Sequence, residues 1–178
     1  WRSPRQQRIA RHLINSGFDF VLGHGSHAIQ EIDRESDRWI VYSIGNGNFQ
    51  SGGRWKRLGA ENKVLPYSFW SILEVALVGN ERSISIKLYP VYSDNRETRY
   101  QPRPIDEINF REVVFELARR AAPRDSFPLE HVQLGHDDLG HFIQLDVAMW
   151  PVSGSPLSIG ADAVTPSSDA LLDENRAT

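Results

Sequence analysis

Two histidines in one short glycine-containing stretch are the densest concentration of potential chemistry in the sequence. His24 and His27 belong to the run Gly-His-Gly-Ser-His at residues 23–27, which directly follows an apolar segment. Neutral imidazole is the commonest metal-ligating side chain, and a tight turn at a strand end lets two rings three residues apart approach one point. Hydrogen-bonded turn residues can have the same spacing, so the pattern alone leaves both interpretations open.

A second polar loop follows the next apolar segment and has Asn46 near its start. Residues 45–48 are Gly-Asn-Gly-Asn, and residues 39–44 before them are almost entirely apolar. The Asn46 amide could ligate a hard metal or bind a phosphate oxygen, and we expect it to contact substrate. An ordinary turn would use the same residue types, because Asn and Gly both tolerate positive φ.

A small basic and aromatic patch is a third candidate. Arg54, Lys56 and Arg57 flank Trp55, and we expect Arg54 to contact a phosphate or an anionic polymer. A solvated loop anchored by one tryptophan is the simpler alternative.

A histidine series near the C-terminus carries a weaker signal. His131, His136 and His141 recur every five residues, with two aspartates between the last two. A separation of five puts neighbours in a strand on opposite faces, and His136 is expected in a turn. The spacing therefore argues against a metal cluster here.

The elements that must position these side chains alternate between helix and strand. Ser3 and Pro4 predict a helix start, and Gly17 its end. Residues 18–22 and 39–44 are apolar enough for buried strands, and we expect them in one sheet with their C-terminal loops side by side. Alternating patterns then predict a hairpin over residues 69–91, a helix that Asp106 caps, and a last hairpin over residues 132–145 around residues 136–140. The fold class is α/β.

Composition limits the remaining possibilities. The 178 residues allow one domain, which we place at residues 1–150, with a tail at residues 151–178 expected to be disordered. There is no cysteine, which excludes disulfides and thiolate sites, and the net charge of −3 argues against a nucleic-acid partner. No apolar run is long enough to span a membrane. The four arginines and no acid among the first 17 residues, after an initial Trp1, suggest the interior of a longer protein.

Residues 17–30 resemble the capsule-synthesis protein CapA family, which is associated with poly-γ-glutamate capsules. The shared pattern is an apolar strand, a Gly-His-rich turn that ends in His27, and then two apolar residues and a glutamine. Residues 37–46 look like the family's next strand, which ends in Tyr-Ser-Leu-Gly-Asn-Phe, and the resemblance extends over about residues 4–145. It departs at Gly25-Ser26, where the family often has His-Pro-His, and at Gly47, where it has Phe.

This resemblance implies a fold and a chemistry. The chain would be the C-terminal part of a calcineurin-like metallophosphatase β-sandwich flanked by helices. His24 and His27 would help to hold two divalent ions of the Mn, Fe or Zn type, while the other ligands would lie in a missing N-terminal half. The substrate would be phosphorylated or an anionic polymer. The chain alone is expected to be inactive.

The resemblance also implies a setting in the cell. The parent would be a bacterial protein of capsule or cell-envelope synthesis that acts beside other capsule-synthesis proteins, and a missing N-terminal anchor could hold it at the envelope. Two alternatives remain open at this point. One is a non-catalytic accessory that binds an anionic polymer through the Arg54 loop, and the other is a truncated reading frame without activity of its own.

Overall fold

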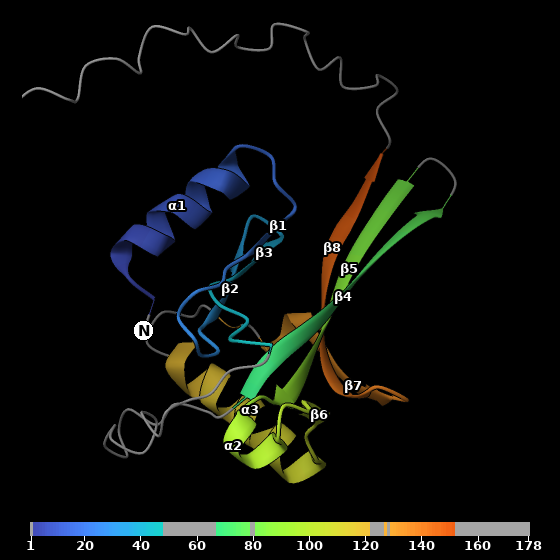
Figure 1. Cartoon of the computed structure of the whole chain (residues 1–178). Coiled ribbons are helices and arrows are strands. Elements are labelled where there is room, and N and C mark those ends of the chain that lie inside the picture. The colour runs from blue at the N-terminus through green and yellow to red at the C-terminus, as the bar shows by residue number, and fades with distance from the viewer. Residues whose placement is uncertain (1, 48–66, 79–80, 122–126, 128, 152–178) are drawn as a thin grey trace, which may run out of the picture.

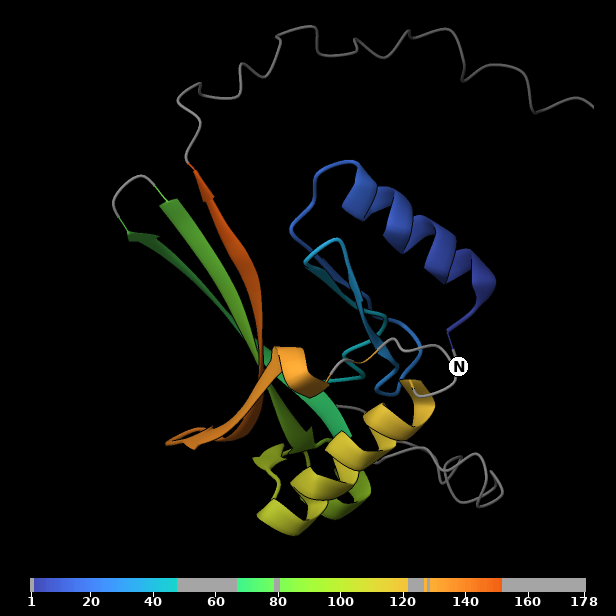
Figure 2. The ribbon, with the colours of Figure 1, turned by 180° about the vertical axis from the view of Figure 1, so that it is seen from behind.

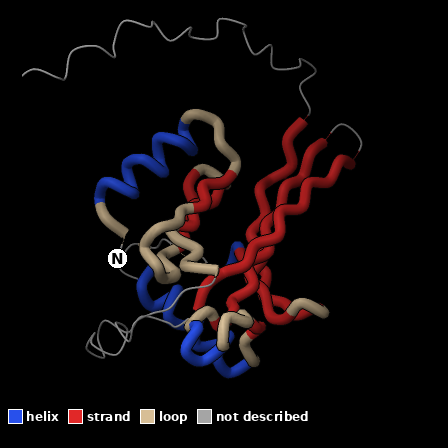
Figure 3. The backbone as a smooth tube through the Cα atoms, in the orientation of Figure 1, coloured by secondary structure: helices blue, strands red, loops and turns tan. Residues whose placement is uncertain are grey.

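The structure is a computed structural model that describes residues 2–47, 67–78, 81–121, 127 and 129–151. The helices are α1 (Pro4–Asn15), α2 (Asn95–Thr98) and α3 (Glu107–Ala121), with one 3-10 turn, η4 (Leu129–His131). The strands are β1 (Phe20–Leu22), β2 (Ile32–Glu35), β3 (Arg38–Val41), β4 (Tyr67–Val78), β5 (Glu81–Tyr92), β6 (Arg103–Pro104), β7 (Val132–Asp137) and β8 (Gly140–Pro151). They form two sheets (Figure 3).

Helix α1 begins where the sequence predicts it. The Ser3 hydroxyl accepts a hydrogen bond from the Gln6 amide, and the Gln6 side chain accepts one from the Ser3 amide, which together form a capping box. The buried face of the helix carries Ile14, which packs against Ile40 and Tyr42 of the strand region below. This apolar contact attaches α1 to one face of the smaller sheet.

The smaller sheet has the order β1-β3-β2, and β1 is parallel to β3 with Phe20 opposite Trp39. The prediction that these two segments share a sheet is therefore confirmed. Strand β3 is buried on both faces, as predicted. Strand β1 is not, since Phe18 before it is 54% exposed and Leu22 is 43% exposed. The reason is that β1 is an edge strand, with no partner on its other side among the described residues.

Strand β2 was not predicted, because its sequence is largely charged. It pairs with β3 through a tight turn in which Ser36 and Asp37 both have positive φ. Its Asp33 is buried and forms an ion pair with Arg2 and a hydrogen bond with the Tyr42 hydroxyl. Partners distant in the sequence thus compensate the buried charge.

The larger sheet has the order β4-β5-β8-β7, and β6 also pairs with β5. Both predicted hairpins are present, and all pairs are antiparallel. The predicted position of the turn in the last hairpin was wrong. Strands β7 and β8 extend to Asp137 and from Gly140, so His136 lies in a strand and not in the turn.

Together these elements form layers, with α1, the smaller sheet and the larger sheet in that order (Figure 1). The main core lies between the two sheets and α3, which covers one end of the larger sheet (Figure 2). Asp106 caps α3 by accepting a hydrogen bond from the Asn109 amide at 2.9 Å, as predicted. The fold is mixed α/β, with two sheets and flanking helices. Among the described residues, no helix has the length and apolarity needed to cross a membrane.

Candidate functional site

The loop after β1 is fastened to the chain beyond β3. The Gly23 amide donates to the Val41 carbonyl at 2.7 Å, and the Ile44 amide donates to the Gly23 carbonyl at 3.0 Å. A Cβ atom at residue 23 would lie 2.0 Å from the Tyr42 carbonyl oxygen, so only glycine allows this approach. The start of the histidine loop is therefore fixed against the neighbouring strand.

The loop after β3 is built around Gly45 and Asn46. Gly45 has a φ of +77°, and Asn46 is only 8% exposed. The Asn46 amide donates to the Ser68 hydroxyl at 2.9 Å, and that hydroxyl donates to the Ser93 hydroxyl at 2.8 Å. Neither serine was singled out in the sequence, because each sits in a strand or loop pattern that gives no sign of this contact.

These two loops meet through the side chains of His27 and Asn46. His27 Nδ1 lies 2.9 Å from Asn46 Oδ1, and Asn46 Nδ2 donates to the His27 main-chain carbonyl at 3.3 Å. Because the amide nitrogen is turned to that carbonyl, the amide oxygen faces the ring and requires a proton on Nδ1. The lone pair of the neutral ring is then on Nε2. A second side chain that fixes the tautomer in this way is typical of metal-ligating histidines.

His24 is less constrained. Its side chain is exposed, and it makes no hydrogen bond or ion pair with any other described residue. The described part of the chain also contains no group of three or more His, Asp, Glu or Cys side chains arranged to hold a metal ion. The structure therefore brings His27 and Asn46 together, as the strand-end argument predicted, and leaves His24 in the same loop without a partner there. Arg54 lies outside the described residues.

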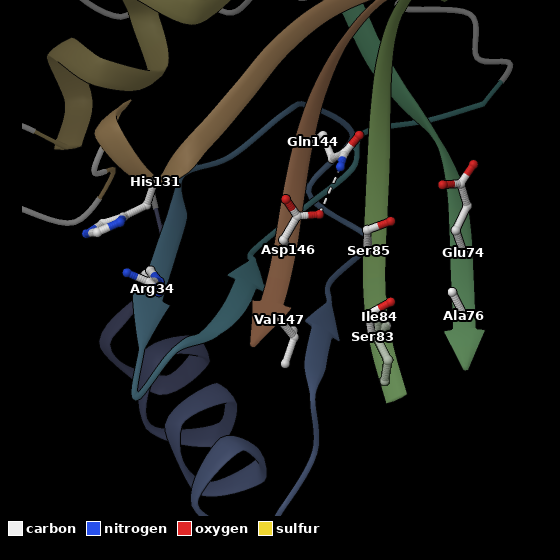
Figure 4. Close-up of a pocket in the computed structure, with 10 residues that line it drawn as sticks. All are labelled: Arg34, Glu74, Ala76, Ser83, Ile84, Ser85, His131, Gln144, Asp146 and Val147. Atoms are coloured by element: carbon white, nitrogen blue, oxygen red, sulfur yellow. Dashed lines mark hydrogen bonds between the residues drawn. The ribbon is translucent and has the colours of Figure 1, made fainter. Parts of the chain in front are cut away.

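One concavity borders the loop after β3, and a second lies apart from both loops. One, of about 580 Å³, borders Ile44 and Gly47 beside the candidate site and is walled mainly by apolar side chains that include Phe69 and Trp70. The other, of about 560 Å³, opens over the larger sheet and collects residues from β2, η4, β4, β5 and β8 (Figure 4).

Two charged side chains of this second concavity already have partners. Arg34 forms an ion pair with Asp37 at 2.7 Å, and Asp146 accepts a hydrogen bond from Gln144 at 2.9 Å, drawn as a dashed line in Figure 4. His131 also lines it, with Arg34 beside it in the close-up, so His131 faces this pocket and not the hairpin tip that carries the other two histidines of its series.

The C-terminal histidine series was misjudged in one respect. His136 and His141 are directly opposite each other in β7 and β8, and their ring centroids are 4.6 Å apart. The prediction treated neighbours of the series as lying on opposite faces of a strand and placed His136 in the hairpin turn. The turn is in fact at Asp138 and Leu139, and a cross-strand pair shares one face.

A hydrogen-bonded carboxylate lies next to this pair along β7. Asp137 accepts hydrogen bonds from the Tyr89 hydroxyl at 2.8 Å and from Lys87 at 3.4 Å. Partial desolvation raises the pKa of Asp137, but these hydrogen bonds and that of the Leu139 amide outweigh it and hold the pKa below its usual value. Desolvation and the bond to Asp137 raise the pKa of Tyr89 to about 12.

Known proteins match the part of the chain that contains the His27–Asn46 contact. Residues 1–51 match the family described as bacterial capsule synthesis protein PGA_cap. Over 55 residues the chain is 38% identical to the capsule biosynthesis protein CapA of Bacillus anthracis and 34% identical to the PGA biosynthesis protein CapA of Bacillus subtilis strain 168. Each alignment covers 31% of this chain, but only 13% and 14% of the two relatives. The segment with α1, β1, the histidine loop and β3 is therefore similar to the bacterial capsule synthesis protein family, which the sequence resembles.

Proposed function

We propose that this chain contributes to bacterial capsule synthesis as part of a metal-dependent, phosphoesterase-like hydrolase. The loops after β1 and β3 would form one edge of its active site. Support comes from the two capsule biosynthesis relatives and from one contact, the hydrogen bond between His27 Nδ1 and Asn46 Oδ1. That contact joins the two loops that the family shares, and it presents His27 with a defined lone-pair nitrogen.

The donor chemistry of this edge suits ions of the Mn, Fe or Zn type, because neutral imidazole is a good ligand for them. When bound, two such ions polarise a phosphoryl oxygen and activate water. In this proposal His27 holds an ion through Nε2, and Asn46 orients the ring. His24 lies in the same loop and adds a second imidazole.

The chain on its own would supply only part of such a site. Two imidazoles fill half of a tetrahedral shell, and catalytic zinc sites commonly use three protein ligands. The alignments cover a small share of the relatives, so other ligands can come from sequence outside the matched segment. We therefore expect weak divalent-metal binding at His24 and His27 in the isolated 178-residue chain.

A substitution at His27 tests the proposal in the full gene product that contains these residues. Hydrolysis of p-nitrophenyl phosphate would be measured with added Mn²⁺, alongside metal content and thermal unfolding. His27→Ala should lower activity more than about 100-fold, because losing a ligand should cost at least as much as losing a residue that only orients one. It should lower the melting temperature by no more than the loss of one hydrogen bond to Asn46 accounts for, since the His27 side chain is otherwise exposed.

His12→Ala is the matched control, because His12 is exposed on α1 and takes no part in the loop. Full activity and metal content in His27→Ala would refute the ligand assignment. A gene product without hydrolase activity that binds poly-γ-glutamate, and loses this binding in Arg54→Ala, would favour the non-catalytic accessory.

A further inference from the structure

The tip of the β7–β8 hairpin carries a pair of histidines that the proposed active site does not use. His136 and His141 occupy directly opposed positions, with ring centroids 4.6 Å apart and ring planes inclined by 62°. Directly opposed residues of antiparallel strands project from the same face of the sheet. The two imidazoles therefore lie side by side on one surface.

Neighbouring residues support the His141 ring and the hairpin that carries both histidines. The His141 ring is stacked on Phe110 of α3, with centroids 5.0 Å apart and planes within 17° of each other. In the hairpin the Phe142 ring packs closely on Gly135, since a Cβ atom at residue 135 would lie 2.3 Å from that ring. At its tip Asp137 accepts a hydrogen bond from the Leu139 amide at 3.0 Å. The pair is therefore carried by a hydrogen-bonded hairpin that packs against α3.

The ring nitrogens of this pair are not used by the fold. Within the part of the chain that the structure describes, the side chains of His136 and His141 make ring contacts but no hydrogen bond or ion pair. His136 is exposed and His141 is half-buried, so solvent reaches the pair. Two adjacent imidazoles without hydrogen-bonding partners contrast with His27, whose Nδ1 is bonded to Asn46.

The local charge favours a cation. Asp106, the capping residue of α3, is close enough to His141 for the two to interact electrostatically, and hydrogen bonds from Asn109 together with this interaction lower its pKa. Asp138 lies in the turn beside the pair. Lys87, by contrast, is bound to Asp137 and lies over the ring of Phe142.

We propose that His136 and His141 form a two-histidine chelating site for a late first-row divalent cation, of which Zn²⁺ is the example tested below. Zinc–imidazole bonds are about 2.0–2.1 Å long, so two ligating nitrogens on a tetrahedral ion are about 3.3 Å apart. Two rings with centroids 4.6 Å apart reach that separation by small side-chain rotations. Water fills the remaining positions. The site is separate from the His24 and His27 loop.

Calorimetric titration of the 178-residue chain with Zn²⁺ alone tests this site. We expect one ion per hairpin, no heat with Mg²⁺, and at least about a tenfold loss of affinity in His136→Ala, because removing even a residue that only orients a ligand costs this much. His141→Phe keeps an aromatic ring on Phe110 but removes the nitrogens, so it should weaken binding as much as His136→Ala while preserving the melting temperature.

Two control variants separate this site from the others. His131→Ala should bind like the unmodified chain, because His131 faces the concavity over the larger sheet. The double variant His24→Ala/His27→Ala should keep the hairpin site and lose only binding that belongs to the proposed active site. In the His24→Ala/His27→Ala background, absence of Zn²⁺ binding, or binding that survives both His136→Ala and His141→Phe, would overturn the inference without touching the proposed function.

Discussion

The tautomer of His27 depends on one amide side chain. The Asn46 side-chain oxygen accepts a hydrogen bond from His27 Nδ1–H, and the Asn46 amide nitrogen donates one to the His27 main-chain carbonyl. Asn46→Ala removes the acceptor, so we expect the ring to move toward the Nε2–H form that free imidazole side chains prefer. Nitrogen-15 NMR of the ring at about pH 8.5, above the usual imidazole pKa of about 6.5, would show the change. Asn15→Ala, at the exposed end of α1, should leave the His27 signals in place. A His27 spectrum that is identical in Asn46→Ala and the parent would contradict the assignment.

The Asp137 carboxylate should make the free energy of unfolding depend on pH in the acid range. Hydrogen bonds hold its pKa in the folded state below that in the unfolded chain. Its contribution is therefore complete above the unfolded pKa of about 3.9 and disappears as the pH falls through the lower, folded value. Asp137→Asn should lower the melting temperature at pH 7, and the difference from the parent should shrink as the pH falls to about 2.5, because the parent carboxylate becomes progressively protonated. Thermal unfolding at the two pH values checks this, and an undiminished difference in acid would argue against it.

At the scale of elements, the turn after β3 depends on a glycine that lies close against Ser68. A Cβ atom at Gly45 would lie 2.8 Å from the Ser68 hydroxyl and 3.2 Å from its Cα atom, and its φ is +77°. Gly45→Ala should therefore destabilise the fold by about 1–3 kcal/mol and displace Asn46 from His27. Gly47→Ala is the matched control, since nothing lies within 4 Å of a Cβ atom there. Urea unfolding measures the stability of both variants. If Gly45→Ala were as stable as Gly47→Ala, the turn would accommodate a Cβ atom at residue 45 without loss of stability.

The elements that could be predicted are those with continuous or regularly alternating apolar residues. The segments of β1 and β3 end in glycine-rich loops, and their parallel pairing brought His27 to Asn46 as expected. Strand β2 could not be predicted in this way, because the buried Asp33 depends on Tyr42 and on Arg2, which lies 31 positions earlier in the chain. A periodicity argument cannot foresee a charge that is compensated by a distant partner.

The histidine pair shows how sensitive a site is to an element boundary. Placing the hairpin turn at residues 136–140 instead of 138–139 separated His136 from His141 in the prediction. Strand side chains alternate with a period of two, so an error of this size changes which residues share a face. The support from Phe110 is likewise invisible in the sequence, because α3 reaches the hairpin only through tertiary packing.

At the scale of the whole molecule, one tryptophan joins the two sheets. Trp39 of β3 is fully buried, and its Nε1 donates to the main-chain carbonyl of Asp146 in β8 at 2.8 Å. Trp39→Phe removes this hydrogen bond, leaves the carbonyl unsatisfied and opens a cavity between the layers, so it should cost about 2–4 kcal/mol. Trp70→Phe is the control, because Trp70 is 49% exposed on β4, and its cost should stay within about 0.5 kcal/mol.

Urea unfolding followed by both circular dichroism and tryptophan fluorescence would measure these costs and test whether the sheets unfold together. Because the contact of Trp39 spans the main core, we expect the two probes to give one coincident transition that moves as a unit in Trp39→Phe. If the fluorescence transition had its midpoint at a lower urea concentration than the circular dichroism transition, the smaller sheet would unfold before the larger one. The sheets would then be separate cooperative units. The histidine hairpin on β7 and β8 would then be stable without the loops that carry His27.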